Sequence, residues 1–121
     1  MVLEGEELMP NQTKIKKPLE REIQKSCIDF LNMLGIFNFK INNGGVYIKS
    51  KDRYMVAQTK GIADLIVFPG NGRTICIEFK TEIGRQSADQ AEFQRNCEKN
   101  EIDYWIIRSV DVLRDKIQGR Y

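Results

Sequence analysis

Apolar residues recur along this chain with two spacings, one typical of helices and the other of strands. Between Pro18 and Gly35 they return every three or four positions, as they do along the buried face of a helix, at Ile23, Cys27, Leu31 and Leu34. Pro18 suits the first helical turn, and Gly35 suits the position just after the last. A helix is therefore predicted from about residue 18 to residue 34.

Two further helices are predicted from their N-terminal residues. Ser87 and Gln90 form a Ser-x-x-Gln capping box, in which each side chain bonds the other residue's backbone, so a helix is predicted over about residues 88–99. Ser109 is a good N-cap for a short last helix, which Gly119 is expected to end.

Strands are predicted where β-branched and aromatic residues alternate with polar ones or run together. Residues 36–41 alternate in this way and precede a strong turn signal, Asn42-Asn43-Gly44-Gly45. Residues 46–60 predict a loop or hairpin that is rich in basic and aromatic side chains. Residues 103–108 are apolar enough to be buried on both faces, as a central strand would be.

The clearest pattern is a β-hairpin within residues 61–80. Its strands are the apolar runs 65–68 and 74–79, and Pro69-Gly70-Asn71-Gly72-Arg73 between them has the composition of a turn. An antiparallel hairpin followed by a strand–helix–strand crossover calls for a mixed sheet. The sequence therefore predicts an α/β fold over residues 18–121, preceded by a flexible arm at residues 1–17.

Pairing that is symmetric about Asn71 sets Asp64 directly across from Glu78, with Cβ atoms roughly 5 Å apart. The side-chain period of two puts Lys80 on the same face as Glu78. Opposed carboxylates are unfavourable unless a cation offsets them, and carboxylates that leave room for water suit Mg²⁺ or Mn²⁺. The alternative is a surface hairpin with a solvated charge cluster.

Composition narrows the possible chemistry. The chain has no histidine, which excludes histidine-based nucleophile pairs and imidazole zinc sites, and its three cysteines are expected to be buried free thiols. No apolar run approaches the ~20 residues that cross a bilayer, and the N-terminus lacks a signal peptide pattern, so a cytoplasmic protein is expected.

The net charge is only +2, but residues 40–60 carry a local excess of four positive charges. This basic stretch directly precedes the carboxylate hairpin, where a phosphate backbone would approach a metal ion. This composition fits nucleic-acid contacts by Lys49, Lys51, Arg53 and Lys60 and an ordinary exposed hairpin equally well, and only the motifs that follow favour the first.

Three motifs resemble those of VRR-NUC nucleases, a branch of the PD-(D/E)XK superfamily with small stand-alone phage and bacterial members. They are Lys60-Gly61-Ile62-Ala63-Asp64, Glu78-Phe79-Lys80-Thr81 and Gly84-Arg85-Gln86-Ser87-Ala88-Asp89-Gln90. Ala63 stands where the superfamily name implies proline. The resemblance implies a restriction-endonuclease-like core with a mixed central β-sheet flanked by helices.

The resemblance also implies an activity and roles for individual residues. It implies a Mg²⁺-dependent DNA endonuclease in which Asp64, Glu78 and the backbone carbonyl of Phe79 hold the metal and Lys80 stabilises charge. Glu22, with Glu20 as the alternative, would complete the metal site from the first helix. Gln90 would help to place substrate or water, although a side chain committed to its N-cap is not expected to do both. Arg85 would contact phosphate.

A chain this small, with no accessory module, resembles stand-alone enzymes that act as homodimers on branched DNA such as four-way (Holliday) junctions. A two-fold dimer presents two sites to two symmetry-related strands. Two other classes stay open on sequence alone, a non-catalytic nucleic-acid-binding module of the same fold and a phage structural or interaction protein. Interface candidates are the apolar residues least needed by the core, among them Ile36, Phe37, Val46, Tyr47 and Ile48.

Overall fold

A computed structural model of the chain describes residues 17–41, 46–51, 53–55 and 59–120. Apart from Lys17, the arm predicted at residues 1–17 lies outside the described residues, as does the turn predicted at 42–45. No described helix combines the length and the apolar character that crossing a bilayer requires.

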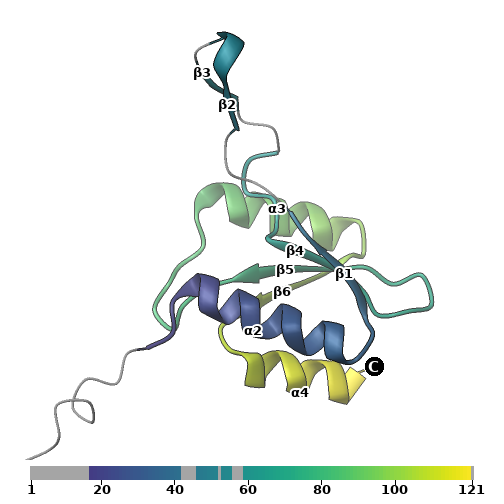
Figure 1. Cartoon of the computed structure of the whole chain (residues 1–121). Helices are drawn as coiled ribbons and strands as arrows, with labels where there is room; N and C mark the ends of the chain where they lie inside the picture. The colour runs from purple at the N-terminus through teal and green to yellow at the C-terminus, as the bar shows by residue number, and fades with distance from the viewer. Residues whose placement is uncertain (1–16, 42–45, 52, 56–58, 121) are drawn as a thin grey trace, which may run out of the picture.

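A mixed four-stranded sheet forms the centre of the molecule (Figure 1). Its order is β1-β4-β5-β6, with bounds Phe37–Lys40, Leu65–Phe68, Ile75–Phe79 and Asp103–Ile107. The β1–β4 and β4–β5 pairs are antiparallel, and the β5–β6 pair is parallel. The mixed sheet predicted from the hairpin and the crossover is confirmed.

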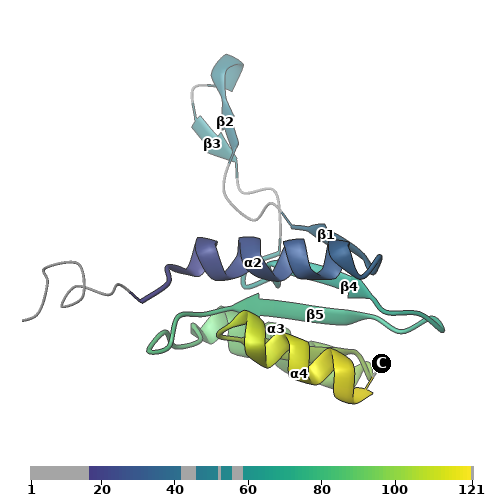
Figure 2. The same cartoon turned by 60° about the horizontal axis from the view of Figure 1, so that its bottom comes forward.

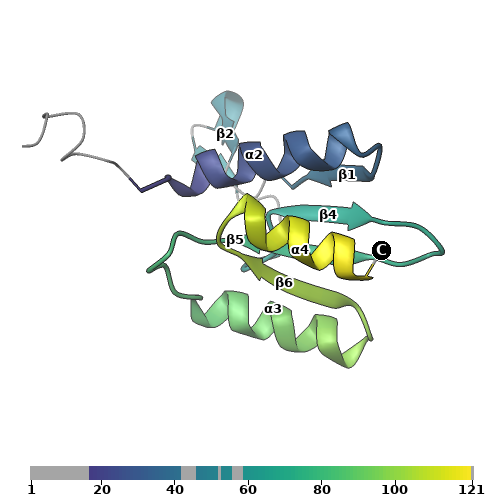
Figure 3. The same ribbon diagram turned by 90° about the horizontal axis from the view of Figure 1, so that it is seen from below.

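Helices cover both faces of this sheet, and Figure 3 shows α2 and α3 with the strands between them. α2 (Glu20–Met33) and α4 (Val110–Arg120) pack on one face, in a core with the odd-numbered residues of β4, β5 and β6. α3 (Ala88–Lys99) packs on the other face, where Cys97 meets Ala63 and Cys76. Cys27, Cys76 and Cys97 are buried free thiols, as predicted.

The sequence pattern misplaced one strand. β6 was expected to be central because its residues are so apolar, but it lies at the edge of the sheet, and β5 is the strand buried along its whole length. β6 can be apolar at an edge because α3 packs on one of its faces and α4 on the other. The helices thus replace the neighbouring strand in covering its side chains.

The helix boundaries follow the predicted caps with two exceptions. The first is that α2 begins at Glu20 with Leu19 as its N-cap, so Pro18 precedes the first turn instead of lying in it. Gly35 has the left-handed backbone (φ +72°) that ends α2, and the Ser109 hydroxyl accepts a hydrogen bond from Val112 N–H (3.2 Å) at the start of α4. Gly119 was expected to end α4, but the helix continues through it to Arg120. A glycine inside a helix destabilises it by only about 1 kcal/mol relative to alanine. Gly119 does not have the left-handed backbone that would end the helix.

The basic segment forms a separate hairpin of β2 (Val46–Ile48) and β3 (Arg53–Met55), joined through a short 3₁₀ helix, η1 (Lys49–Lys51). Figures 1 and 2 both show this hairpin extending away from the four-stranded sheet. The N-termini of α2 and α3 and the C-terminus of β5 lie together at one end of the sheet, on the left in Figure 1.

Candidate active site

The hairpin register is the predicted one, except at its most important residue. Leu65 pairs with Ile77 and Val67 pairs with Ile75, as symmetry about Asn71 requires. Asp64 was expected to face Glu78, but its backbone N–H instead donates to the carbonyl of Ile77 (3.0 Å), the residue already opposite Leu65. Two residues facing one is the arrangement of a β-bulge, which locally redirects a side chain.

The redirected Asp64 carboxylate lies beside the end of β5. Its Oδ2 accepts a hydrogen bond from the backbone N–H of Phe79 (2.9 Å), and its own carbonyl accepts one from Ile41 N–H (2.8 Å). These two hydrogen bonds hold Asp64 between β1 and β5, at the end of β5 where Glu78 and Lys80 lie. The side chain remains partly exposed to solvent.

Glu78 is the one charged residue that lies within the buried set of the described chain, with 1% of its surface exposed. The pKa of Glu78 is raised from 4.5 to about 8, mainly by burial and then by the charge of Asp64, a side-chain hydrogen bond with Asp64 and the charge of Glu20, whereas Lys80 lowers it. The side chain therefore holds a proton near neutral pH, because ionising it would place a second negative charge in a dry environment.

The two oxygens of Glu78 have different surroundings. Oε2 accepts a hydrogen bond from Gln90 Nε2 (2.7 Å) and lies 3.9 Å from Lys80 Nζ. Oε1 is buried and has no donor among the described residues. A buried oxygen without a hydrogen-bond donor is destabilising. The proton that Glu78 shares with Asp64, or a cation in its place, would satisfy this oxygen.

Gln90 caps its own helix and also contacts the carboxyl pair. Its Oε1 accepts from Ser87 N–H (2.9 Å), which completes the capping box, while its Nε2 donates to Glu78. Both contacts are possible because an amide side chain has an acceptor end and a donor end that bond in different directions. The cap therefore fixes the orientation in which Gln90 meets Glu78.

Gly61 is a positioning residue that the sequence did not single out beyond its place in a motif. Its backbone is left-handed (φ +74°) and lies against the first turn of α3. A Cβ at this position would lie 2.3 Å from the carbonyl carbon and oxygen of Asp89 and 2.7 Å from the backbone nitrogen of Gln90. Only glycine allows this approach, which sets the N-terminus of α3 over Asp64 and Glu78.

Lys80 continues the strand beyond Glu78, with its backbone N–H donating to Ile107 (3.1 Å) and only 12% of its side chain exposed. The loop that follows is held by Arg108, which sequence reasoning missed. Arg108 Nη1 donates to the carbonyls of Thr81 (2.6 Å) and Gly84 (2.8 Å). Its acceptors are backbone carbonyls brought near by the β5–β6 pairing, so no sequence signal indicates them.

The two glutamates of the first helix have different positions. Glu22 is exposed, and its Oε1 accepts a hydrogen bond from Leu19 N–H (2.8 Å), which caps its own helix. The charge of Glu20, by contrast, is close enough to raise the pKa of Glu78. Of the two candidates, the structure therefore brings Glu20 toward the carboxyl pair and gives Glu22 a capping role.

The predicted nucleic-acid contacts are only partly described. Lys49, Lys60 and Arg85 are exposed. Lys51 lies in η1 and Arg53 in β3, but their side chains are outside the described part of the structure, as are those of β2.

The described residues contain no group of three or more His, Cys, Asp or Glu side chains arranged to hold a metal ion. They do provide two adjacent carboxyls, one of which has a buried oxygen without a donor. Hard cations such as Mg²⁺ commonly take one or two protein carboxylates and keep several waters, so this donor set fits a hydrated divalent cation.

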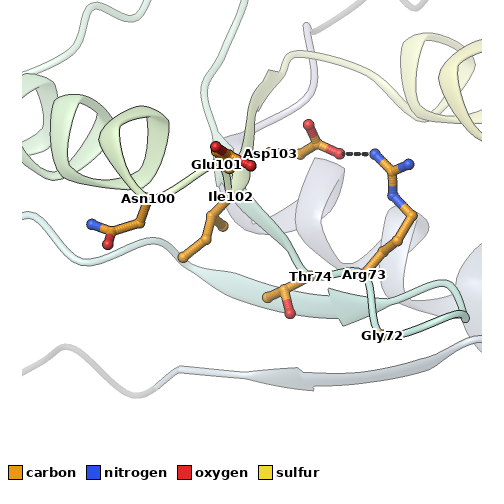
Figure 4. A pocket seen from close by; sticks show the side chains of 7 residues that line it. All are labelled: Gly72, Arg73, Thr74, Asn100, Glu101, Ile102 and Asp103. Atoms are coloured by element: carbon orange, nitrogen blue, oxygen red, sulfur yellow. Dashed lines mark hydrogen bonds and ion pairs between the residues drawn. The ribbon is translucent and has the colours of Figure 1, made fainter.

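A hollow of about 440 Å³ lies at the opposite end of the sheet, around the 69–74 turn and the start of β6 (Figure 4). In it, Arg73 and Asp103 form an ion pair at 2.7 Å, and Glu101 and Asn100 lie nearby. Its charged groups are exposed, and the carboxyl pair is at the far end of the same strands. This hollow is therefore separate from the candidate active site.

Comparison with known proteins bears on the fold. No protein-family model matches the sequence, and no curated protein matches it. The structure is similar to a solved structure described as a VRR_NUC domain, with a TM-score of 0.63 over 84% of this chain and 97% of that one, at 19% sequence identity. The expected α/β architecture of mixed sheet and flanking helices is thus confirmed, and the chain has the fold of a VRR_NUC domain.

Proposed function

We propose that this protein is a metal-dependent endonuclease that hydrolyses DNA phosphodiester bonds. The observation that carries the proposal is the buried Glu78, which meets Asp64, Lys80 and Gln90 at one end of a sheet with the VRR_NUC fold. Burying a carboxyl without full pairing is destabilising, and such sites are where function is concentrated.

Asp64, Glu78 and the backbone carbonyl of Phe79 would hold Mg²⁺, with Mn²⁺ as a substitute, and Glu20 or Glu22 would add an outer carboxylate. When bound, such a cation supplies a water of lowered pKa and offsets charge on the phosphate. Asp64 is already fixed for this role by the Phe79 N–H. Glu78 must lose its proton to take part, so cation binding is expected to release a proton and to strengthen as pH rises.

Lys80 and Gln90 complete the arrangement. The Lys80 ammonium, 3.9 Å from Glu78 Oε2, is placed to counter negative charge that develops on the phosphate. Gln90 donates a hydrogen bond to Glu78 Oε2. The other oxygen, Oε1, has no donor among the described residues and would be the one to contact a cation. Exposed Lys49, Lys60 and Arg85, with Lys51 and Arg53, would contact the DNA backbone.

The test is DNA cleavage by purified protein in Mg²⁺, Mn²⁺ or EDTA, combined with Mn²⁺ binding measured by calorimetry. Glu78→Gln should abolish cleavage and weaken Mn²⁺ binding, because it removes the charge but keeps the shape. Glu82→Gln is the matched control, since Glu82 is an exposed carboxylate only four residues away. DNA binding without cleavage or metal affinity would instead indicate a non-catalytic nucleic-acid-binding module.

We further propose that the enzyme acts as a homodimer on branched DNA, such as a four-way junction. Support comes from β1, an edge strand whose Phe37 and Phe39 are 66% and 44% exposed. The Phe37 ring stacks on Phe68 with a centroid distance of 5.1 Å, which gives a continuous aromatic surface. Ile36 is partly buried against the core and is a weaker interface candidate than Phe37.

Two measurements test the assembly and the substrate. Light scattering at micromolar concentration should give twice the monomer mass, and Phe37→Ser with Phe39→Ser should return it to the monomer value. A four-way junction should be cut in preference to a linear duplex of equal length. A monomeric wild type that cuts both equally would remove this part of the proposal and leave the nuclease assignment intact.

A further inference from the structure

A second charged feature lies beside the carboxyl pair, between α2 and β1. It is a hollow of about 320 Å³ lined by Arg21, Gln24, Lys25, Ile28, Asp29 and Lys40. Three of these six side chains are cations and one is an anion. We call this feature the α2–β1 hollow.

The charges in the α2–β1 hollow are not balanced. Lys25 Nζ forms an ion pair with Asp29 Oδ2 at 2.8 Å, which accounts for the one acidic group. Arg21 and Lys40 are exposed and make no ion pair or side-chain hydrogen bond with any described residue. Arg21 and Lys40 therefore line the same cavity without an anionic partner among the described residues.

The hollow adjoins the candidate active site through both of its elements. Lys40 is the last residue of β1 and pairs with Leu65, which follows Asp64, and the residue after Lys40, Ile41, donates its N–H to the Asp64 carbonyl. Arg21 directly follows Glu20, whose charge acts on Glu78. A DNA strand bound at Asp64 and Glu78 would therefore lie close to this surface.

We propose that the α2–β1 hollow binds backbone phosphates of the DNA strand that flank the bond to be cut. The inference rests on the proposed nuclease function. The Arg21 guanidinium can bind two phosphate oxygens at once, Lys40 supplies a second positive charge, and Gln24 supplies an amide donor. Because these groups would bind phosphate oxygens, the contact does not depend on base identity.

The experiment measures DNA binding by fluorescence anisotropy in EDTA over a range of KCl concentrations, where no cleavage can occur. The Arg21→Gln/Lys40→Gln variant is compared with the matched control Arg95→Gln/Lys99→Gln, which removes the same two charges from exposed positions on α3. Removing two cations that bind phosphate should lower the slope of log affinity against log salt by roughly 1.8. Affinity at about 0.1 M KCl should fall on the order of tenfold, and the control should keep the wild-type slope.

The outcomes separate this inference from the proposed function. Weaker binding and a smaller slope in the Arg21/Lys40 variant alone support the hollow, even if the wild type proves unable to cleave. Unchanged binding, or an equal decrease in the control, overturns it, even if the wild type cleaves in Mg²⁺. A wild type that neither binds nor cleaves DNA overturns both. Circular dichroism melts of both variants check that the exposed changes leave the fold intact.

Discussion

The two ends of the central sheet contain similar groups in opposite arrangements. At the turn end, Arg73 and Asp103 pair at 2.7 Å with both side chains partly exposed, so their charges are neutralised and hydrated. At the site end, Lys80 lies 3.9 Å from a Glu78 that is almost fully buried and has one oxygen without a donor among the described residues. The comparison indicates that the presence of charged groups does not by itself identify a functional site. A charged group that is buried and incompletely paired is the more informative feature.

Two glycines, Gly61 and Gly72, show the same difference between the site end and the turn end. Gly61 and Gly72 share a backbone angle, φ +74°, but a Cβ on Gly72 would meet no described atom within 4 Å, whereas one on Gly61 would overlap α3. Gly72 is needed only for its turn. Gly61 is needed for the turn and for the position of the helix that presents Gln90. Matched pairs of this kind allow the site end to be tested against the turn end.

The largest effect should come from the charged groups themselves. Asp64→Ala, Glu78→Ala and Lys80→Ala should each lower the rate of DNA cleavage by several orders of magnitude, because each removes a group that would act on the reacting phosphate. Single-turnover assays with metal at saturation measure this. Arg73→Gln and Asp103→Asn are the controls from the turn end, and cleavage by them should equal that of the wild type. Full activity in Glu78→Ala would refute the proposed site.

The ionisation of Glu78 should make the metal-free protein less stable as pH rises. The folded protein keeps a proton on Glu78 up to a pKa of about 8, whereas an unfolded glutamate loses it near its ordinary value of 4.5. Between these values the folded state binds more protons, so the free energy of unfolding falls with rising pH, by on the order of a few kcal/mol.

Urea denaturation in EDTA at pH 5 and pH 8.5 measures this decrease in stability. Glu78→Gln should make the metal-free protein nearly insensitive to pH in this range and more stable than the wild type at pH 8.5. Adding Mn²⁺ should restore stability to the wild type but not to Glu78→Gln. A wild type whose stability is the same at both pH values would show that Glu78 is ionised throughout.

The two glycines give a smaller and more local effect. Alanine at either position must adopt a left-handed backbone at a cost of about 1–2 kcal/mol. Gly61→Ala must also displace the first turn of α3, which should add about 1–3 kcal/mol and lower cleavage. Urea midpoints measure the stability, and the NMR signal of the Gln90 side-chain amide, assigned with Gln90→Ala, reports on its contact with Glu78. That signal should move in Gly61→Ala and stay in place in Gly72→Ala.

The smallest effect should come from the basic hairpin, because each contact between a cation and a phosphate contributes separately to binding. Changing Lys49, Lys51 and Arg53 together to Gln should flatten the salt dependence of DNA binding by roughly 0.9 for each phosphate that is no longer neutralised, without regard to DNA sequence. The Arg95/Lys99 variant is again the control for removal of charge. A slope equal to that of the wild type would leave the hairpin without a role in binding phosphate.

Much of the architecture could be predicted because it depends on local sequence patterns. The capping box of Ser87 and Gln90 fixed the start of α3, and the turn around Asn71 fixed the hairpin register from Leu65 to Val67. The carboxylates at the ends of those strands then had to lie near each other. What local patterns could not give was the position of β6, since an apolar strand may be covered by a neighbouring strand or by helices.

The amino-acid sequence shows which groups are available: two carboxyls, one lysine and one glutamine, with no histidine, at spacings that a hairpin and a helix bring together. How these groups meet depends on the tertiary fold. The bulge at Asp64, the approach of Gly61 to α3 and the hold of Arg108 on the 81–84 loop all depend on backbone contacts between segments far apart in the chain. Backbone groups are the same in every residue, so a sequence cannot show which of them will be bonded from a distance.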